Sequence, residues 1–232
     1  DILLFTDVIA LLSIDCLQKV VSAFNDPSVG VVSGDYQFLK PLLPEQQRYW
    51  QYQNKLKRAE GALGAVIGVP GAMFAMRARL VECIPHHTIN DDFVLPMRAL
   101  QQGYQAVVDP DLGIVELESD SAATDLKRRV RIGAGNIQQL WMLRKMLLPQ
   151  NGWSAFNFFS GKGLRALMPL VIITAMISLL GLCLQGSQLA MWLTAGGIAS
   201  IALPAVVRIV RPSAQLPILS SLEYLVANYT YA

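Results

Sequence analysis

The sequence predicts an α/β domain followed by transmembrane helices, and three observations lead to this expectation. Hydrophobic residues make up 53% of the 232 residues, and the mean hydropathy of +0.39 exceeds that of ordinary soluble domains. Charge is unevenly distributed, because Asp1–Arg165 carries nearly all of it and Ala166–Val207 contains no Lys, Arg, Asp or Glu. Within the charged part, short apolar runs typical of strands alternate with stretches of helical periodicity.

The charged part begins with a run that favours a buried strand. Ile2–Phe5 is entirely apolar, which is typical of a strand in the middle of a sheet. We therefore expect its neighbouring strands to lie upstream and the chain to be truncated at its N-terminus. Apolar residues at helical spacing then predict a helix at Ile14–Phe24, whose buried face would hold Ile14, Leu17, Val20, Val21 and Phe24.

The remaining elements of the charged part follow from the same periodicities, with glycine and proline breaks between them. They are a strand at Val29–Val32, helices at Glu45–Ala59 and Asp91–Gln101, strands at Ala72–Arg77, Gln105–Val108 and Ile114–Leu117, and a long helix near Thr124–Leu147.

Two stretches of the neutral region are long enough to cross a bilayer. Ala166–Leu184 and Leu189–Val207 each hold about 19 residues, or roughly 28 Å of helix. A buried helical hairpin is the alternative, but such helices usually carry a polar stripe, and the polar residues here are only Thr174, Ser178, Thr194 and Ser200. Leu216–Ala232 carries Glu223 and Asn228 and fits either an interfacial helix or the start of a third span.

Basic residues flank these stretches on one side. Lys162 and Arg165 precede the first, Arg208 and Arg211 follow the second, and the connection Gln185–Gln188 is uncharged. Because basic flanks stay in the cytoplasm, we expect an integral protein of the inner or plasma membrane with a cytoplasmic charged domain.

Cysteine spacing and net charge argue against other classes of protein. Cys16, Cys83 and Cys183 lack the spacing of zinc ligands or of a disulfide framework. A net charge of +2 is too small to indicate a nucleic-acid polymer as partner.

Four short segments occur in the order FTDVI, GVPGAMFAMR, TINDDF and RRVRI. This order resembles the family 2 glycosyltransferases, which include cellulose and hyaluronan synthases, and connecting stretches such as QGYQAVVDP and SGKGLRALMPL add to the resemblance. It implies a partial GT-A nucleotide-sugar domain over residues 1–160, with the uridine-binding strands upstream, and transmembrane helices over residues 161–232. It also implies a membrane-bound inverting transferase with a nucleotide-sugar donor, a saccharide or lipid-linked acceptor, and membrane lipid as partners.

Sugar transfer from a nucleotide diphosphate needs a base for the acceptor hydroxyl and positive charge for the leaving phosphates. Asp91 and Asp92 resemble the acidic pair of the family, which implies that Asp92 is the general base and that Asp91 supports it. The alternative is ordinary capping, because Asn90 can cap a helix and first-turn acids gain about 0.3–1 kcal/mol from the helix dipole.

The basic segment lies on the long predicted helix. At 100° per residue Arg128, Arg131 and Ile132 fall on one face, while Leu126 and Val130 point the opposite way. A solvated helix surface is the alternative. The segment resembles the Q/R-x-x-R-W motif of the family, which implies that Arg128 and Arg131 face the donor diphosphate and that position 132 lines the acceptor. Ile132 replaces the aromatic ring on which an acceptor sugar would stack, which argues against synthesis of cellulose-like or hyaluronan-like polymers.

The segment Asp7-Val8-Ile9 departs from the D-x-D or D-x-N metal motif of the family. The resemblance implies that Asp7 contacts the donor and a divalent cation, Mg²⁺ or Mn²⁺, but Ile9 cannot supply the second ligand. Either Asp7 holds the cation together with the diphosphate and waters, or the site is impaired. His86 and His87 are a further candidate ligand pair, with plain surface as the alternative.

Gly71 resembles the glycine of the acceptor-site turn, where the absence of a side chain lets substrate approach the backbone. The alternative is a simple break between loop and strand. The departures at Ile9 and Ile132 also leave a second functional hypothesis open, a catalytically impaired membrane scaffold or partner-binding subunit of a polysaccharide-synthesis system.

Overall fold

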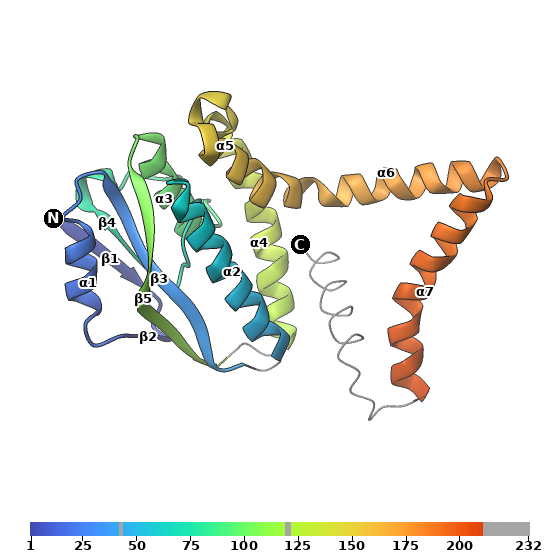
Figure 1. Ribbon diagram of the computed structural model, residues 1–232, viewed down its shortest axis with the longest axis horizontal. Helices are drawn as coiled ribbons and strands as arrows, with labels where there is room; N and C mark the ends of the chain where they lie inside the picture. The colour runs from blue at the N-terminus through green and yellow to red at the C-terminus, as the bar shows by residue number, and fades with distance from the viewer. Residues whose placement is uncertain (42–43, 119–121, 211–232) are drawn as a thin grey trace. The chain divides into compact units, whose positions relative to one another are not determined.

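The computed structural model describes residues 1–41, 44–118 and 122–210 (Figure 1). The chain divides into two compact units, Asp1–Gly163 and Leu164–Ala232. The candidate site residues named above all lie in the first unit.

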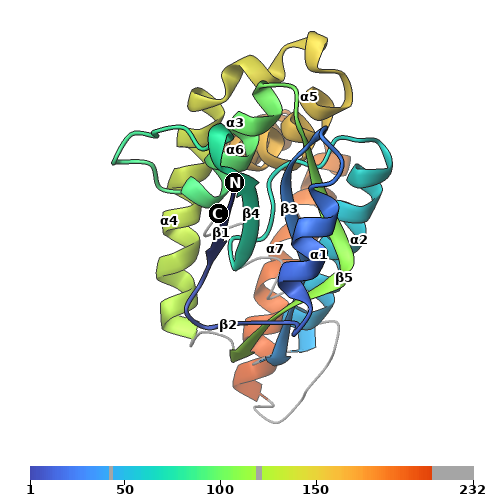
Figure 2. The ribbon, with the colours of Figure 1, turned by 90° about the vertical axis from the view of Figure 1, so that its left-hand side faces the viewer.

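The first unit is built on a five-stranded mixed sheet of order β1-β4-β3-β5-β2. β3 and β5 pair in parallel, whereas the other three pairs are antiparallel, and Figure 2 shows β1, β4 and β3 side by side. The strands are β1 Ile2–Thr6, β2 Ala10–Leu12, β3 Val29–Lys40, β4 Met73–Arg77 and β5 Gln105–Glu118.

Five described helices of this unit accompany the sheet. They are α1 Cys16–Ala23, α2 Pro44–Ala62, α3 Asp91–Gln101, α4 Ala122–Met142 and α5 Gly152–Phe158. Short turns join them: the 3₁₀ turns η1 Ala78–Leu80, η2 Arg144–Leu147 and η3 Pro149–Asn151, and a π-helical turn, η4, at Phe159–Gly163.

Successive side chains of each strand enter different cores because they alternate between the faces of the sheet. Val32 packs with Val20 of α1, whereas its neighbour Val31 packs with Leu95 and Ala99 of α3. α1 and α3 therefore cover opposite faces, and Figure 2 shows α1 in front of the strands. A hydrogen bond from the Lys19 ammonium to the Asp111 carbonyl (2.5 Å) also links α1 to β5.

A third cluster joins α3 to the elements that precede the apolar segment. Phe93 and Met97 of α3 pack with Leu143, Met146 and Phe158, all of which are buried. The Phe93 and Phe158 rings stack with their centroids 6.0 Å apart. The start of α3 is thereby fixed from the side opposite to the sheet.

The middle position expected for the first strand depends on strands upstream and stays a prediction. β1 lies at the edge of the described sheet and pairs with β4 alone, so Leu3 is 44% exposed. A run of apolar residues indicates burial in general, but it does not specify which strands provide it.

The long strand β5 corrects the prediction of two separate strands. Asp109-Pro110-Asp111 lies between the two predicted strands, and the sheet accommodates it as an irregularity, with a register shift between Gly34 and Asp35 of β3. Gly34 permits this close approach, because a Cβ atom there would lie 1.9 Å from the Leu112 carbonyl oxygen. β3 consequently continues to Lys40 rather than ending near Gly34.

The helices agree with the predictions in position and differ at their ends and faces. α3 has the predicted bounds, whereas α1 begins at Cys16, which leaves Ile14 outside the helix and fully exposed. The buried residues of α1 are Cys16 and Val20, while Leu17 and Val21 face outward. Val130 of α4, which was expected on the face opposite to the arginines, is 56% exposed.

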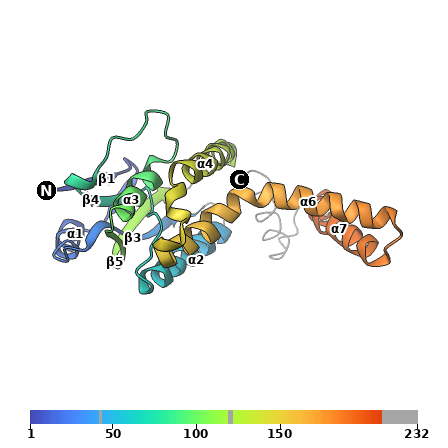
Figure 3. The ribbon, with the colours of Figure 1, turned by 90° about the horizontal axis from the view of Figure 1, so that it is seen from above.

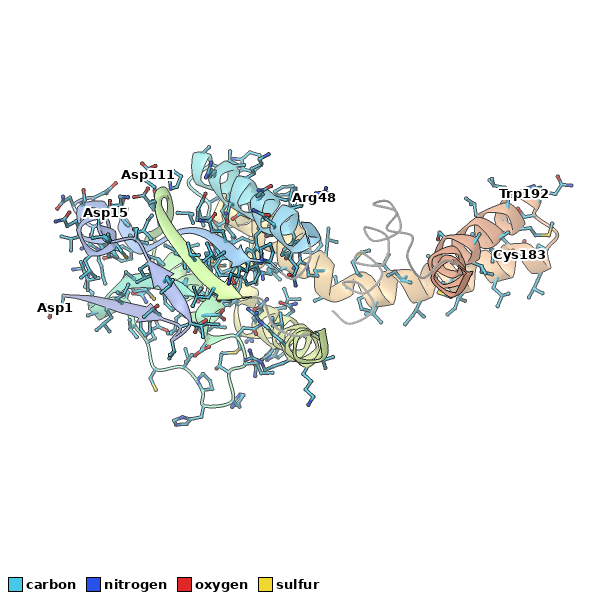
Figure 4. The ribbon with its side chains drawn as sticks, turned by 90° about the horizontal axis from the view of Figure 1, so that it is seen from below. Asp1, Asp15, Arg48, Asp111, Cys183 and Trp192 are labelled. Carbon is cyan, nitrogen blue, oxygen red and sulfur yellow. The ribbon has the colours of Figure 1, made fainter. Side chains whose placement is uncertain are left out.

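The second unit consists of two described helices, α6 Leu164–Leu184 and α7 Gln188–Val210, which meet at a short turn (Figure 3). Next to this turn, the Cys183 sulfur lies 3.6 Å from the Thr194 hydroxyl oxygen, and Figure 4 labels Cys183 together with Trp192. Arg211 and Leu216–Ala232 lie outside the described residues.

One helical run in the described part of the chain is long and apolar enough to cross a membrane. This run, Pro149–Leu184, contains an 18-residue window of mean hydropathy 2.5 in which no residue is buried. α6 forms its apolar part and includes the first predicted span. The second predicted span, within α7, stays a prediction.

Candidate active site

Asp91 and Asp92 occupy the first turn of α3. Asp91 is exposed and one of its carboxylate oxygens accepts a hydrogen bond from the Asp92 backbone N–H (3.0 Å), whereas Asp92 is half-buried. Burial raises the pKa of the Asp92 carboxyl above its ordinary value, and the Asp91 charge adds to this, while Lys162 and Arg131 act in the opposite direction. The two acids therefore stand in different environments.

Asn90 precedes this turn, but its side chain does not cap the helix. The Asn90 amide nitrogen instead donates to the Gln139 side-chain oxygen (3.3 Å) and to the Ile132 carbonyl (3.4 Å), both on α4. The buried side chains of Asn90 and Gln139 thus fasten the start of α3 to α4. The Asn90 side chain therefore does not have the capping role that the sequence suggested.

Gly71 lies directly against the Asp92 carboxylate. A Cβ atom at position 71 would lie 2.2 Å from Asp92 Oδ2. The next residue, Ala72, accepts a hydrogen bond at its carbonyl from the Asp7 backbone N–H (3.0 Å). Asp7, Gly71 and Asp92 thus form one continuous region, although Asp7 follows β1 and Asp92 begins α3.

The two arginines predicted on α4 approach this region at different points. Both side chains are exposed, and Arg131 acts electrostatically on the Asp92 carboxyl. The charges of Arg128 and Asp7 both influence the pKa of the Tyr36 hydroxyl, which is buried on β3; Arg128 lowers this pKa and Asp7 raises it. Burial raises the pKa of Tyr36, and the neighbouring Glu116 carboxylate adds to the effect.

Three residues near the predicted site were missed by sequence reasoning. Glu116 is only 4% exposed, and an acid within the apolar run of β5 was a usable signal for a special position. Tyr36 carried no such signal. Lys162 lies in the π-helical turn, with its ammonium 4.7 Å from the centre of the Phe93 ring, and its flanking glycines hinted at a close approach of the backbone.

Ile132 is half-buried and lies beside Arg131 on α4. Its carbonyl faces Asn90 at the start of α3, so position 132 lies near the acidic pair. His86 and His87 are exposed in the loop before α3, and the His87 carbonyl accepts a hydrogen bond from the Gln138 side chain (2.9 Å). In the described chain these histidines belong to no cluster of three or more side chains able to hold a metal ion.

Asp7 is the predicted metal ligand, and it offers a single exposed carboxylate. It is exposed at the start of a tight turn in which the Ala10 N–H donates to the Asp7 carbonyl (3.1 Å), and this turn also contains Ile9. No group of three metal-ligating side chains occurs among the described residues. A hard cation prefers several oxygen ligands, so one held at Asp7 would take its others from a diphosphate and water.

Ile9→Asp is expected to strengthen use of a cation. Asp7 and Ile9 share one turn and Ile9 is 57% exposed, so a second carboxylate there would meet no steric obstacle. We expect the Mn²⁺ concentration for half-maximal activity to fall by about ten-fold or more, since hard cations gain affinity with each oxygen ligand. The fully exposed neighbour Val8 provides a matched control, Val8→Asp. Strong chelator inhibition of the natural protein together with loss of activity in Ile9→Asp would contradict this account.

Comparison with known proteins bears on the fold. No protein-family model matches the chain, and no curated protein matches it. A solved structure that is similar is the mannosyltransferase PcManGT from Pyrobaculum calidifontis in complex with GDP-Man and Mn²⁺, with a TM-score of 0.63 and 22% sequence identity. The chain has a glycosyltransferase fold. The match covers 99% of this chain and 61% of the mannosyltransferase. The chain therefore spans about three-fifths of that protein's length.

Proposed function

We propose that the chain carries the catalytic base and the membrane segment of an inverting family 2 glycosyltransferase with a GT-A-like domain. The observation that carries the proposal is the close approach of Gly71 to the Asp92 carboxylate within a glycosyltransferase fold, with Arg131 acting electrostatically on that carboxylate. The half-buried Asp92 carboxylate lies against the Gly71 backbone, and the Arg131 guanidinium acts on it electrostatically. These are the features that transfer of a sugar to a hydroxyl requires.

The reaction is a direct displacement. The acceptor hydroxyl gives its proton to the Asp92 carboxylate as its oxygen attacks the anomeric carbon of the donor sugar. The bond between that carbon and the donor diphosphate oxygen breaks, and the diphosphate leaves with the bonding electrons. Attack from the side opposite to the leaving group inverts the anomeric configuration. A raised pKa suits Asp92 to this role, because a carboxylate with more affinity for protons is a stronger base.

Arg128 and Arg131 receive the departing diphosphate. Guanidinium groups bind phosphate oxygens through paired hydrogen bonds, and both side chains are exposed on α4. Asp7 would hold a divalent cation in this region, and such a cation would neutralise part of the diphosphate charge. The GDP-Man and Mn²⁺ bound by the similar mannosyltransferase support a nucleotide-sugar donor and a divalent cation here.

The acceptor is a saccharide or a lipid-linked saccharide at the membrane. Gly71 lets the Asp92 carboxylate lie against the loop backbone, and Ile132 offers the acceptor an aliphatic surface rather than a ring. The exposed apolar run that ends at Leu184 supports an integral membrane location, with the catalytic unit at the cytoplasmic face.

Membrane topology yields a separate prediction. The turn between α6 and α7 is expected outside the cytoplasm, because basic residues flank the two helices at their other ends. A single cysteine introduced as Ser187→Cys, with the natural cysteines replaced, should react with an impermeant maleimide from outside the intact cell. A matched variant, Ser154→Cys, lies before the helices and should react only after permeabilisation. Labelling of position 187 only from the cytoplasmic side would reverse the assignment.

The decisive assay measures nucleotide-sugar turnover by the full-length protein in detergent, with and without Mn²⁺. Release of nucleoside diphosphate that depends on Asp92 is expected for at least one common donor. The second hypothesis, an impaired scaffold, is favoured by Ile9 and Ile132. It predicts binding of nucleotide or partner without turnover under every metal condition.

A further inference from the structure

The loop that leads to Gly71 is buried, which is unusual because loop backbones carry polar groups that need partners. Ala65, Val66 and Ile67 are each at most 2% exposed, and Val69 is 9% exposed. No strand or helix includes residues 65–71, so this backbone needs partners from other elements. The Ala65 N–H donates to the Glu60 backbone carbonyl (2.9 Å), and side chains bond to other groups of the loop.

A charged pair on α2 satisfies the middle of the loop. Glu60 accepts a hydrogen bond at Oε2 from the Ile67 N–H (3.1 Å), and the Lys57 ammonium donates to the Ile67 carbonyl. The two side chains also bond to each other, with 2.9 Å between Lys57 Nζ and Glu60 Oε2. Both polar groups of one peptide residue are therefore held by a single ion pair whose side chains are 15% and 8% exposed.

The loop is held at further points on both sides. The Asn157 side chain of α5 donates to the Ala65 carbonyl (2.9 Å). Gly68, with φ of +59°, lies so close to the Phe93 ring that a Cβ atom would be 2.3 Å from Phe93 Cδ2. The loop thus touches α3 at two successive residues, Phe93 through Gly68 and Asp92 through Gly71.

We propose that Lys57 and Glu60 are positioning residues, which hold the loop 65–71 so that Gly71 stays against the Asp92 carboxylate. The inference rests on the proposed function for its catalytic meaning. A buried ion pair contributes little net stability, because the desolvation cost cancels much of the attraction, and apolar side chains of similar size would stabilise the fold as well. Its directed hydrogen bonds fix the backbone of Ile67 in one place. When the pair is broken, the loop lifts, water reaches Asp92 and the acceptor loses its alignment with the base.

The test compares Lys57→Met and Glu60→Gln in the full-length protein in detergent. Met keeps the aliphatic stem of Lys57, and Gln keeps the shape of Glu60. We expect kcat to fall by about 10- to 100-fold, as small misplacements of reacting groups do, with KM for the nucleotide-sugar within about two-fold. The exposed neighbour Lys55 supplies the matched control, Lys55→Met, which should leave kcat unchanged.

A pH profile separates positioning from a general loss of stability. In the variants water reaches Asp92, so burial raises its pKa less, and the acidic limb of the kcat profile should move to lower pH. Asp91, Lys162 and Arg131, the charged groups that act on Asp92, are unchanged in these variants. A fall in melting temperature with kcat and the acidic limb unaltered would overturn the inference.

Hydrogen exchange tests, without any turnover, whether Lys57 and Glu60 hold the Ile67 backbone. In the natural protein the Ile67 amide should exchange slowly, and in Lys57→Met it should exchange at least about ten-fold faster while Val31 and Val32 stay protected. Fast exchange of Ile67 in the natural protein would overturn the inference even if neither variant folds. Absence of turnover in the natural protein would reject the proposed function instead, and the exchange result would still decide whether Lys57 and Glu60 hold the Ile67 backbone.

Discussion

Asp92→Asn is expected to lower kcat by about 100-fold or more. The substitution keeps the size of the side chain and a hydrogen-bonding group, but it removes the basicity that takes the acceptor proton. Nucleotide affinity should stay near normal, because the groups assigned to the diphosphate lie on α4 and after β1 rather than on α3. Steady-state turnover combined with nucleotide binding by calorimetry measures both quantities.

Asp91→Asn is the matched control for this assignment. Asp91 is exposed and bonds to the backbone of the first turn, so its loss should weaken the helix start and change turnover far less. Side chains of successive helical residues diverge by about 100°, so one substrate atom can be reached by only one of the two acids. Normal turnover in Asp92→Asn, or loss of turnover in Asp91→Asn, would show that the base is wrongly assigned.

The pH dependence of this same site follows from the raised pKa of Asp92. The base works in its ionised form, so turnover rises with pH through that pKa and is lost as pH falls below it. Because burial places the pKa above the ordinary 3.8, activity should begin to fail at a higher pH than an exposed aspartate would give. In Asp92→Asn the remaining turnover should lack this acidic limb.

The site residues that the sequence indicated share a local signal. The acidic pair forms the start of a helix with strong apolar periodicity, and α3 has the predicted bounds. Arg128 and Arg131 were separated from other basic residues by their spacing along one helix. Such signals depend only on neighbours in the sequence, so they can be read without knowing how the chain folds.

The residues that the sequence did not indicate depend on distant contacts. Lys57 and Glu60 look like an ordinary exposed pair three residues apart on a polar helix, and only the fold brings Ile67 between them. Lys162 similarly stands far along the chain from Asp92. The exposed edge of β1 illustrates the reverse case, because the strand was recognised locally while its neighbours were not.

Gly71→Ala is expected to lower kcat by about 100-fold, since displacement of a reacting group by about 1 Å has this effect. The added methyl carbon would lie 2.2 Å from Asp92 Oδ2, so either the carboxylate or the loop must move. Backbone strain does not contribute, because Gly71 is absent from the glycines of positive φ. Gly113→Ala is the matched control, as a Cβ atom at Gly113 would meet nothing within 4 Å.

A double variant shows whether the methyl group acts through Asp92. Effects of residues that act as one unit are not additive. If Gly71→Ala works by moving the carboxylate, then Gly71→Ala combined with Asp92→Asn should turn over no more slowly than Asp92→Asn alone, because the base is already lost. If the two losses multiply, Gly71 acts by another route, such as direct contact with the acceptor. Thermal unfolding of each variant must stay cooperative for the comparison to hold, and the stacked Phe93 and Phe158 rings support the start of α3 in all of them.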